Sequence, residues 1–144
     1  YQVLQDDYAK SPYASMAALQ MAQARVQASQ PDLAIGLYQQ VMQNGYPKAL
    51  TVVARLRLAR LQLDQGQLDA ALATLDGATD TTGFETRFSE VRGDIALAQG
   101  DSEAALSHYL LAINQLQAGE GDRSLLIMKI ESLGGIAPGS GNES

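Results

Sequence analysis

The fold of this chain is decided by two stretches that follow the same pattern. The first reads LARLQLDQGQLDAAL over residues 58–72, and the second reads RGDIALAQGDSEAAL over residues 92–106. In both copies a glycine separates two segments whose apolar residues have helical spacing, and glycine is the residue that most often ends a helix. Gly100 follows Gly66 by 34 residues. The chain is therefore predicted to repeat one helical hairpin.

A weaker third copy lies upstream, over residues 32–42. Ala34, Ala71 and Ala105 then occupy equivalent positions, and a 34-residue helix–turn–helix period is that of the tetratricopeptide repeat. We therefore predict an all-α, tetratricopeptide-like solenoid of helical hairpins, with about three repeats and a C-terminal capping helix. The predicted helices cover residues 13–29, 32–43, 48–65, 68–79, 84–99, 102–117 and 123–133.

Small residues recur where the two helices of a hairpin must approach closely. The first helix of each pair carries Ala22, Ala59 or Gly93, and the second carries Ala34, Ala71 or Ala105. A bulky side chain at such a position would force the helices apart. These residues are predicted to pack the repeats together.

Composition excludes several classes of function. The chain has 144 residues, which suits one domain, and its formal charge is −6, with 10 basic and 16 acidic residues. An acidic chain of this kind is not expected to bind nucleic acid or an anionic membrane surface through charge. Because there is no cysteine, disulfides and thiolate sites are impossible.

Residues that could perform catalysis are sparse. His108 is the single histidine, so a triad or a metal site built on two histidines has no second member. The adjacent acids Asp6 and Asp7 are interpreted as a solvated terminus, and no glycine motif for phosphate binding is present. We predict that the protein is not an enzyme and uses no cofactor, metal or small-molecule substrate.

Five blocks of the sequence resemble one known family. They are YASMAALQMA at 13–22, LRLARLQ at 56–62, DAALATLD at 69–76, VRGDIALAQGD at 91–101 and MKIESL at 128–133. In this order and register they are similar to the YfgM-like proteins, the ancillary subunits of the bacterial Sec translocon. The resemblance covers residues 13–133.

The resemblance implies a location and partners. Such a protein has a membrane-spanning helix followed by a tetratricopeptide-like domain on the periplasmic side of the bacterial inner membrane. It associates with the translocation channel and with a membrane-anchored chaperone of the peptidyl-prolyl isomerase type. We expect a non-enzymatic scaffold that links the Sec channel to periplasmic chaperones; the alternative is an adaptor for another envelope or cytosolic complex.

The same resemblance divides the chain into three parts. Residues 1–12 would follow an absent membrane anchor, and residues 13–133 would form the repeat domain. Residues 134–144 are rich in glycine and serine, which predicts a disordered tail.

The predicted binding surface is the concave groove lined by the first helix of each hairpin. It would carry Leu19, Gln23, Leu56, Arg60, Leu63, Arg87, Glu90 and Asp94. A groove of mixed apolar and polar character suits a helix or an extended chain. The alternative is that many of these residues pack under the capping helix. Arg55, Arg57 and Arg60 fan around their helix, so separate ion pairs are favoured over one shared anion site.

Overall fold

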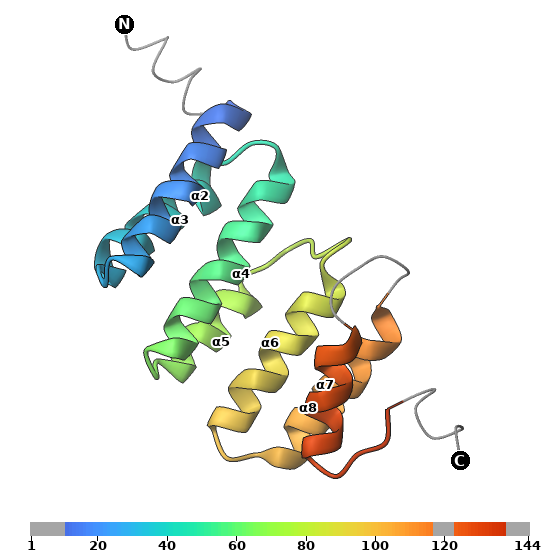
Figure 1. Ribbon diagram of the computed structural model, residues 1–144. Helices are drawn as coiled ribbons and strands as arrows, with labels where there is room; N and C mark the ends of the chain where they lie inside the picture. The colour runs from blue at the N-terminus through green and yellow to red at the C-terminus, as the bar shows by residue number, and fades with distance from the viewer. Residues whose placement is uncertain (1–10, 117–122, 138–144) are drawn as a thin grey trace, which may run out of the picture. The chain divides into compact units, whose positions relative to one another are not determined.

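The computed structural model in Figure 1 describes residues 11–116 and 123–137, and the regular elements among these residues are all α-helices. Each helix end lies within three residues of its predicted position, so the all-α prediction is confirmed. The helices are α2 (Pro12–Gln27), α3 (Pro31–Asn44), α4 (Lys48–Asp64), α5 (Leu68–Asp76), α6 (Glu85–Ala98), α7 (Ser102–Gln115) and α8 (Arg123–Ser132).

The chain forms two compact units where the sequence suggested one domain. The first unit extends to Ala78 and contains α2 to α5, and the second begins at Thr79 and contains α6 to α8. Within the described residues, none of these helices has the length and apolar character needed to cross a bilayer.

Local sequence signals set the helix ends. Gly66 and Gly100 follow α4 and α6 with φ angles of 78° and 85°, a conformation that is strained for other residues. The carboxylate of Asp101 caps α7 by accepting a hydrogen bond from the backbone N–H of Ala104, at 3.0 Å. Ser11 caps α2 in the same way through the N–H of Ala14, at 3.1 Å. These caps and glycines explain why the sequence located the hairpins well.

The core of the first unit is built from α2, α3 and α4, with α3 in contact with both of its neighbours. The predicted packing residues are all 0% exposed: Ala22, Ala34, Ala59 and Ala71. Their small side chains allow neighbouring helices to approach closely. The buried cluster consists of Ala18, Leu19, Ala22, Ala34, Tyr38, Val41, Ala54, Leu58 and Leu61.

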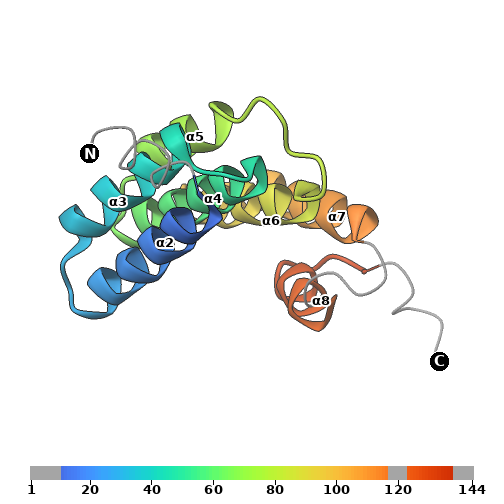
Figure 2. The same cartoon turned by 90° about the horizontal axis from the view of Figure 1, so that it is seen from above.

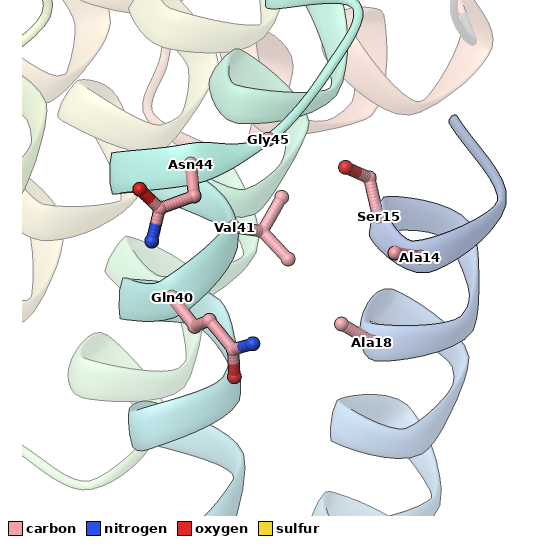
Figure 3. Close-up of a pocket in the computed structure, with 7 residues that line it drawn as sticks. All are labelled: Ala14, Ser15, Ala18, Gln40, Val41, Asn44 and Gly45. Carbon is pink, nitrogen blue, oxygen red and sulfur yellow. The ribbon is translucent and has the colours of Figure 1, made fainter. Parts of the chain in front are cut away.

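A small crevice lies between α2 and α3, where Figure 3 shows Val41 facing Ser15 and Ala18 across it. Its volume of about 20 Å³ has room for a water molecule and for no larger ligand. The buried Ser15 hydroxyl accepts a hydrogen bond from the backbone N–H of Tyr46, at 2.9 Å. This hydrogen bond ties α2 to the α3–α4 connection, and the crevice beside it is a structural feature.

Helix α4 is buried along two stripes. Val52, Leu56 and Ala59 form one stripe, and Ala54, Leu58 and Leu61 form the other; all are buried, while Leu63 is half-buried. Helix α5 is joined to α4 by polar contacts. The Arg55 guanidinium donates to the carbonyl of Thr74 at 2.7 Å, and the Thr74 hydroxyl donates to Gln62 at 2.6 Å.

In the second unit, α6 and α7 form a hairpin, and α8 packs against α7 on one side of this pair (Figure 2). Its buried cluster consists of Ala96, Ala105, Tyr109, Ala112, Ile113, Leu126, Ile130 and Ala137. Leu126 and Ile130 of α8 are buried in this cluster, and Ile127 and Leu133 pack beside them.

Gly93 is buried in the α6–α7 hairpin, next to Tyr109. A Cβ atom at this position would lie 2.5 Å from the Cε1 atom of Tyr109. The residue opposite Gly93 is thus Tyr109, one turn beyond the fully buried Ala105. The missing side chain leaves room for the aromatic ring.

The chain beyond α8 corrects one expectation. A disordered tail was predicted from Gly134, yet Ala137 is 1% exposed and belongs to the core of the second unit. Gly134, with φ 82°, turns the chain after α8, and the N–H of Gly135 donates to the carbonyl of Ile130 at 3.0 Å. Residues 138–144 of that tail, and residues 1–10 of the predicted N-terminal extension, lie outside the described residues.

Candidate partner-binding site

The first unit contains an open cleft formed by α2, α3 and α4, which we call the α2–α4 cleft. Its volume is about 300 Å³, and it is lined by Gln23, Val26, Tyr38, Arg57, Arg60, Leu61 and Asp64. Tyr38 and Leu61 are buried, at 4% and 7% exposure, whereas the other lining residues are exposed. The cleft therefore combines an apolar floor with a polar and charged rim.

The rim is more basic than the rest of the chain. Arg57 and Arg60 lie three residues apart on one face of α4, and Asp64 follows Arg60 by one helical turn. Two cations and one anion thus surround a cleft in a chain whose net charge is −6. This local excess of positive charge favours an anionic group in the ligand.

Tyr38 contributes a neutral hydroxyl near this rim. Burial raises the pKa of Tyr38 above its ordinary value of 10.0, and the positive charge of Arg57 opposes this shift in part. Arg57 and Tyr38 line the same cleft. At neutral pH the Tyr38 side chain therefore remains a neutral phenol at the floor of the cleft.

Among the predicted groove residues of the first unit, the polar ones are exposed and the apolar ones are buried or half-buried. Gln23 and Arg60 line the α2–α4 cleft together, whereas Leu19 belongs to the core and is 5% exposed. Leu56 is buried as well, and Leu63 is half-buried. The polar members of this set are the ones that can meet a partner.

Sequence reasoning missed Arg57, Tyr38 and Asp64 as members of one site. It had placed Arg55, Arg57 and Arg60 on separate faces of their helix, and this holds for Arg55, which turns toward α5. The signal that could have found the pair was the interval of three residues between Arg57 and Arg60, which sets two side chains on one face. The contribution of Tyr38 from α3 had no comparable local signal.

In the second unit, the predicted groove acids are already bound by α8. The Lys129 ammonium donates to Glu90 Oε2 at 2.9 Å and to Asp94 Oδ1 and Oδ2 at 3.0 and 3.2 Å. The Tyr109 hydroxyl also donates to Asp94, and Lys129 Nζ lies 5.5 Å from the centre of the Tyr109 ring. We call Glu90, Asp94, Tyr109 and Lys129 the Lys129 cluster.

This cluster favours the interpretation that Glu90 and Asp94 pack under the capping helix. Their side chains are 20% and 14% exposed, and they form ion pairs with a residue of the capping helix. Packing under α8 therefore accounts for both acids. Arg87, the third predicted groove residue on α6, is exposed.

Within residues 11–116 and 123–137 no cluster of three or more His, Cys, Asp or Glu side chains could hold a metal ion. His108 is half-buried on α7. The polar groups of the α2–α4 cleft are two guanidiniums, a phenol, an amide and a carboxylate. Such groups can bind and orient a ligand through hydrogen bonds and ion pairs.

Comparisons with known proteins agree with this picture. The family model described as a tetratricopeptide repeat-like domain matches residues 1–135. A protein of Neisseria gonorrhoeae named ancillary SecYEG translocon subunit is 34% identical over 130 residues, which are 90% of this chain and 62% of that protein. Its namesake in Escherichia coli K12 is 35% identical over 100 residues, 69% of this chain and 48% of the relative.

A third relative with the same name, from Aggregatibacter actinomycetemcomitans, is 33% identical over 124 residues, 86% of this chain and 59% of the relative. The chain thus spans between about half and three fifths of the length of the curated relatives it matches. These relatives confirm the resemblance to the ancillary Sec translocon subunits. No solved structure matches the chain significantly.

Proposed function

Because this chain belongs to the family of tetratricopeptide repeat-like domains, we propose that it is a non-enzymatic scaffold that binds other proteins. The observation that carries this proposal is its similarity to ancillary translocon subunits over most of its length. The helical hairpins support it, because such repeats present long surfaces to partners. The mixed lining of the α2–α4 cleft supports it further.

The partners that we propose are those of the translocon. The domain would lie on the periplasmic side of the bacterial inner membrane, tethered to it, and would link the Sec channel to a membrane-anchored chaperone of the isomerase type. The name of the relatives supports the channel as a partner.

Co-isolation from membranes tests the proposed function. The parent protein, tagged and extracted in mild detergent, should recover channel subunits together with an isomerase-type chaperone. A photo-reactive residue placed at Gln23, in the α2–α4 cleft, should form adducts with these partners. The same residue at the exposed Asp69 of α5 is the matched control within the same unit.

Two outcomes would count against the proposal. If the tagged protein recovers neither channel subunits nor the chaperone, the translocon is not its partner. If it recovers a different envelope or cytosolic complex, the adaptor alternative is favoured.

A further inference from the structure

The α2–α4 cleft has the properties of a site for one chemical class of ligand. Its volume of about 300 Å³ lies at the lower end of the usual range for ligand sites, roughly 300–1,000 Å³. That space accommodates one or two side chains. Since most of the lining residues are exposed, a chain can enter and leave along the rim.

We propose that the α2–α4 cleft binds an extended polypeptide segment in which an acidic side chain adjoins an apolar one. The proposal rests on the proposed function as a protein-binding scaffold and names the ligand chemistry of its site. The acidic side chain would bind at Arg57, and the apolar one would lie against the exposed side chain of Val26.

The arginines provide the selectivity for the acidic side chain. A guanidinium presents several N–H donors in a planar fork that matches the two oxygens of a carboxylate, and such charge-assisted bonds are stronger than neutral ones. Arg57 and Arg60 hold two such groups on one face of α4. Asp64 disfavours a second acid next to Arg60, so the ligand carboxylate is placed toward Arg57.

The remaining groups suit the main chain and the apolar side chain of the segment. Gln23 on α2 carries both donors and an acceptor, and Asp64 carries an acceptor, so both can bind backbone groups of an extended chain. Tyr38 is already buried, and Val26, which is 38% exposed, provides the apolar surface that is still open to water. Removing this surface from water contributes about 25 cal/mol per Å² of contact.

Fluorescence anisotropy with the purified chain and labelled, end-blocked decapeptides tests the proposal. One peptide has Leu-Glu-Leu at its centre, and its partner has Leu-Gln-Leu in an otherwise equal sequence. The glutamate peptide is expected to bind roughly tenfold more tightly, and this advantage should shrink as salt rises. Arg57→Gln should remove the difference between the peptides. Arg57 is exposed, so the variant retains the fold.

Arg25→Gln is the matched control. Arg25 belongs to the same unit, but its guanidinium donates to the Gln30 side chain at 2.9 Å and does not line the cleft. This variant should keep the wild-type preference for glutamate. A third peptide, with a free C-terminal carboxylate and no acidic side chain, separates an internal acid from a chain end.

Three results would overturn the proposal: equal affinity for the glutamate and glutamine peptides, an unchanged preference in Arg57→Gln, or tightest binding of the peptide with the free C-terminus. If any of these occurs while the parent protein still co-isolates channel subunits, the ligand class is wrong and the scaffold function stands. If co-isolation alone fails, the translocon is not the partner, but the proposed ligand chemistry of the α2–α4 cleft still stands.

Discussion

Two glycines inside helices differ in the space that surrounds them. At Gly93, a Cβ atom would lie 2.5 and 2.7 Å from ring carbons of Tyr109, whereas at Gly36 nothing lies within 4 Å. Gly93→Ala should lower the free energy of unfolding by about 1–2 kcal/mol, because overpacking outweighs the gain of alanine in a helix. Gly36→Ala should raise it by about 0.5–1 kcal/mol. Urea denaturation of both variants measures the two signs.

A gain in both glycine variants would contradict this account. It would mean that the Tyr109 ring shifts at little cost, although it is 1% exposed and its hydroxyl is bonded to Asp94.

Tyr38 makes the free energy of unfolding depend on pH in the alkaline range. Burial raises the pKa of Tyr38 in the folded chain above 10.0, so the unfolded chain releases this proton first as pH rises. The contribution of Tyr38 to the free energy of unfolding is complete below pH 10.0 and is lost as the pH rises above this value. Tyr38→Phe should therefore lose less unfolding free energy than the wild type between neutral pH and pH above 10, as measured by denaturant titrations. Parallel losses in both proteins would contradict the assignment to Tyr38.

At the scale of elements, α8 depends on one cation. Lys129 neutralises Glu90 and Asp94, and its removal would leave two carboxylates close together on α6. Lys129→Met is expected to weaken the docking of α8 by about 1–2 kcal/mol, because bonds to charged groups are among the stronger ones and these are only partly exposed. Hydrogen exchange in the amides of α8 should accelerate by roughly tenfold relative to those of α2.

Lys48→Met provides the control for this prediction. Lys48 is exposed at the start of α4, in the first unit, and the substitution makes the same change in charge. Exchange in α8 should remain at the wild-type rate. Equal acceleration by both variants would show that net charge, and not the Lys129 cluster, controls α8.

At the scale of the whole molecule, the repeats predict equal responses at equivalent positions. Ala34, Ala71 and Ala105 are each 0% exposed on the second helix of a hairpin. Leucine at any of the three should cost about 1–3 kcal/mol by overpacking, whereas Ala24→Leu, at an exposed position of α2, should cost close to nothing. Denaturation midpoints measure all four variants. One tolerant site among the three would show that the hairpins are not equivalent.

The sequence predicted the helices because their signals are local. The apolar spacing, the glycines after α4 and α6 and the cap at Asp101 each act within a few residues. The binding surface depended on contacts between distant residues. Nothing in the sequence near Lys129 indicates that it reaches Asp94, 35 residues earlier, and nothing near Tyr38 indicates that it lines the same cleft as Arg57.

The Lys129 cluster has a consequence for mapping partners by chemistry. The lysines of the chain are Lys10, Lys48 and Lys129. Amine-reactive cross-linkers need an accessible amine, whereas the Lys129 ammonium is held by Glu90 and Asp94 and its side chain is only 23% exposed. Lysine-directed cross-linking would thus under-report whatever touches α8, and reagents aimed at carboxylates or photo-reactive residues would give the fuller map of its neighbours.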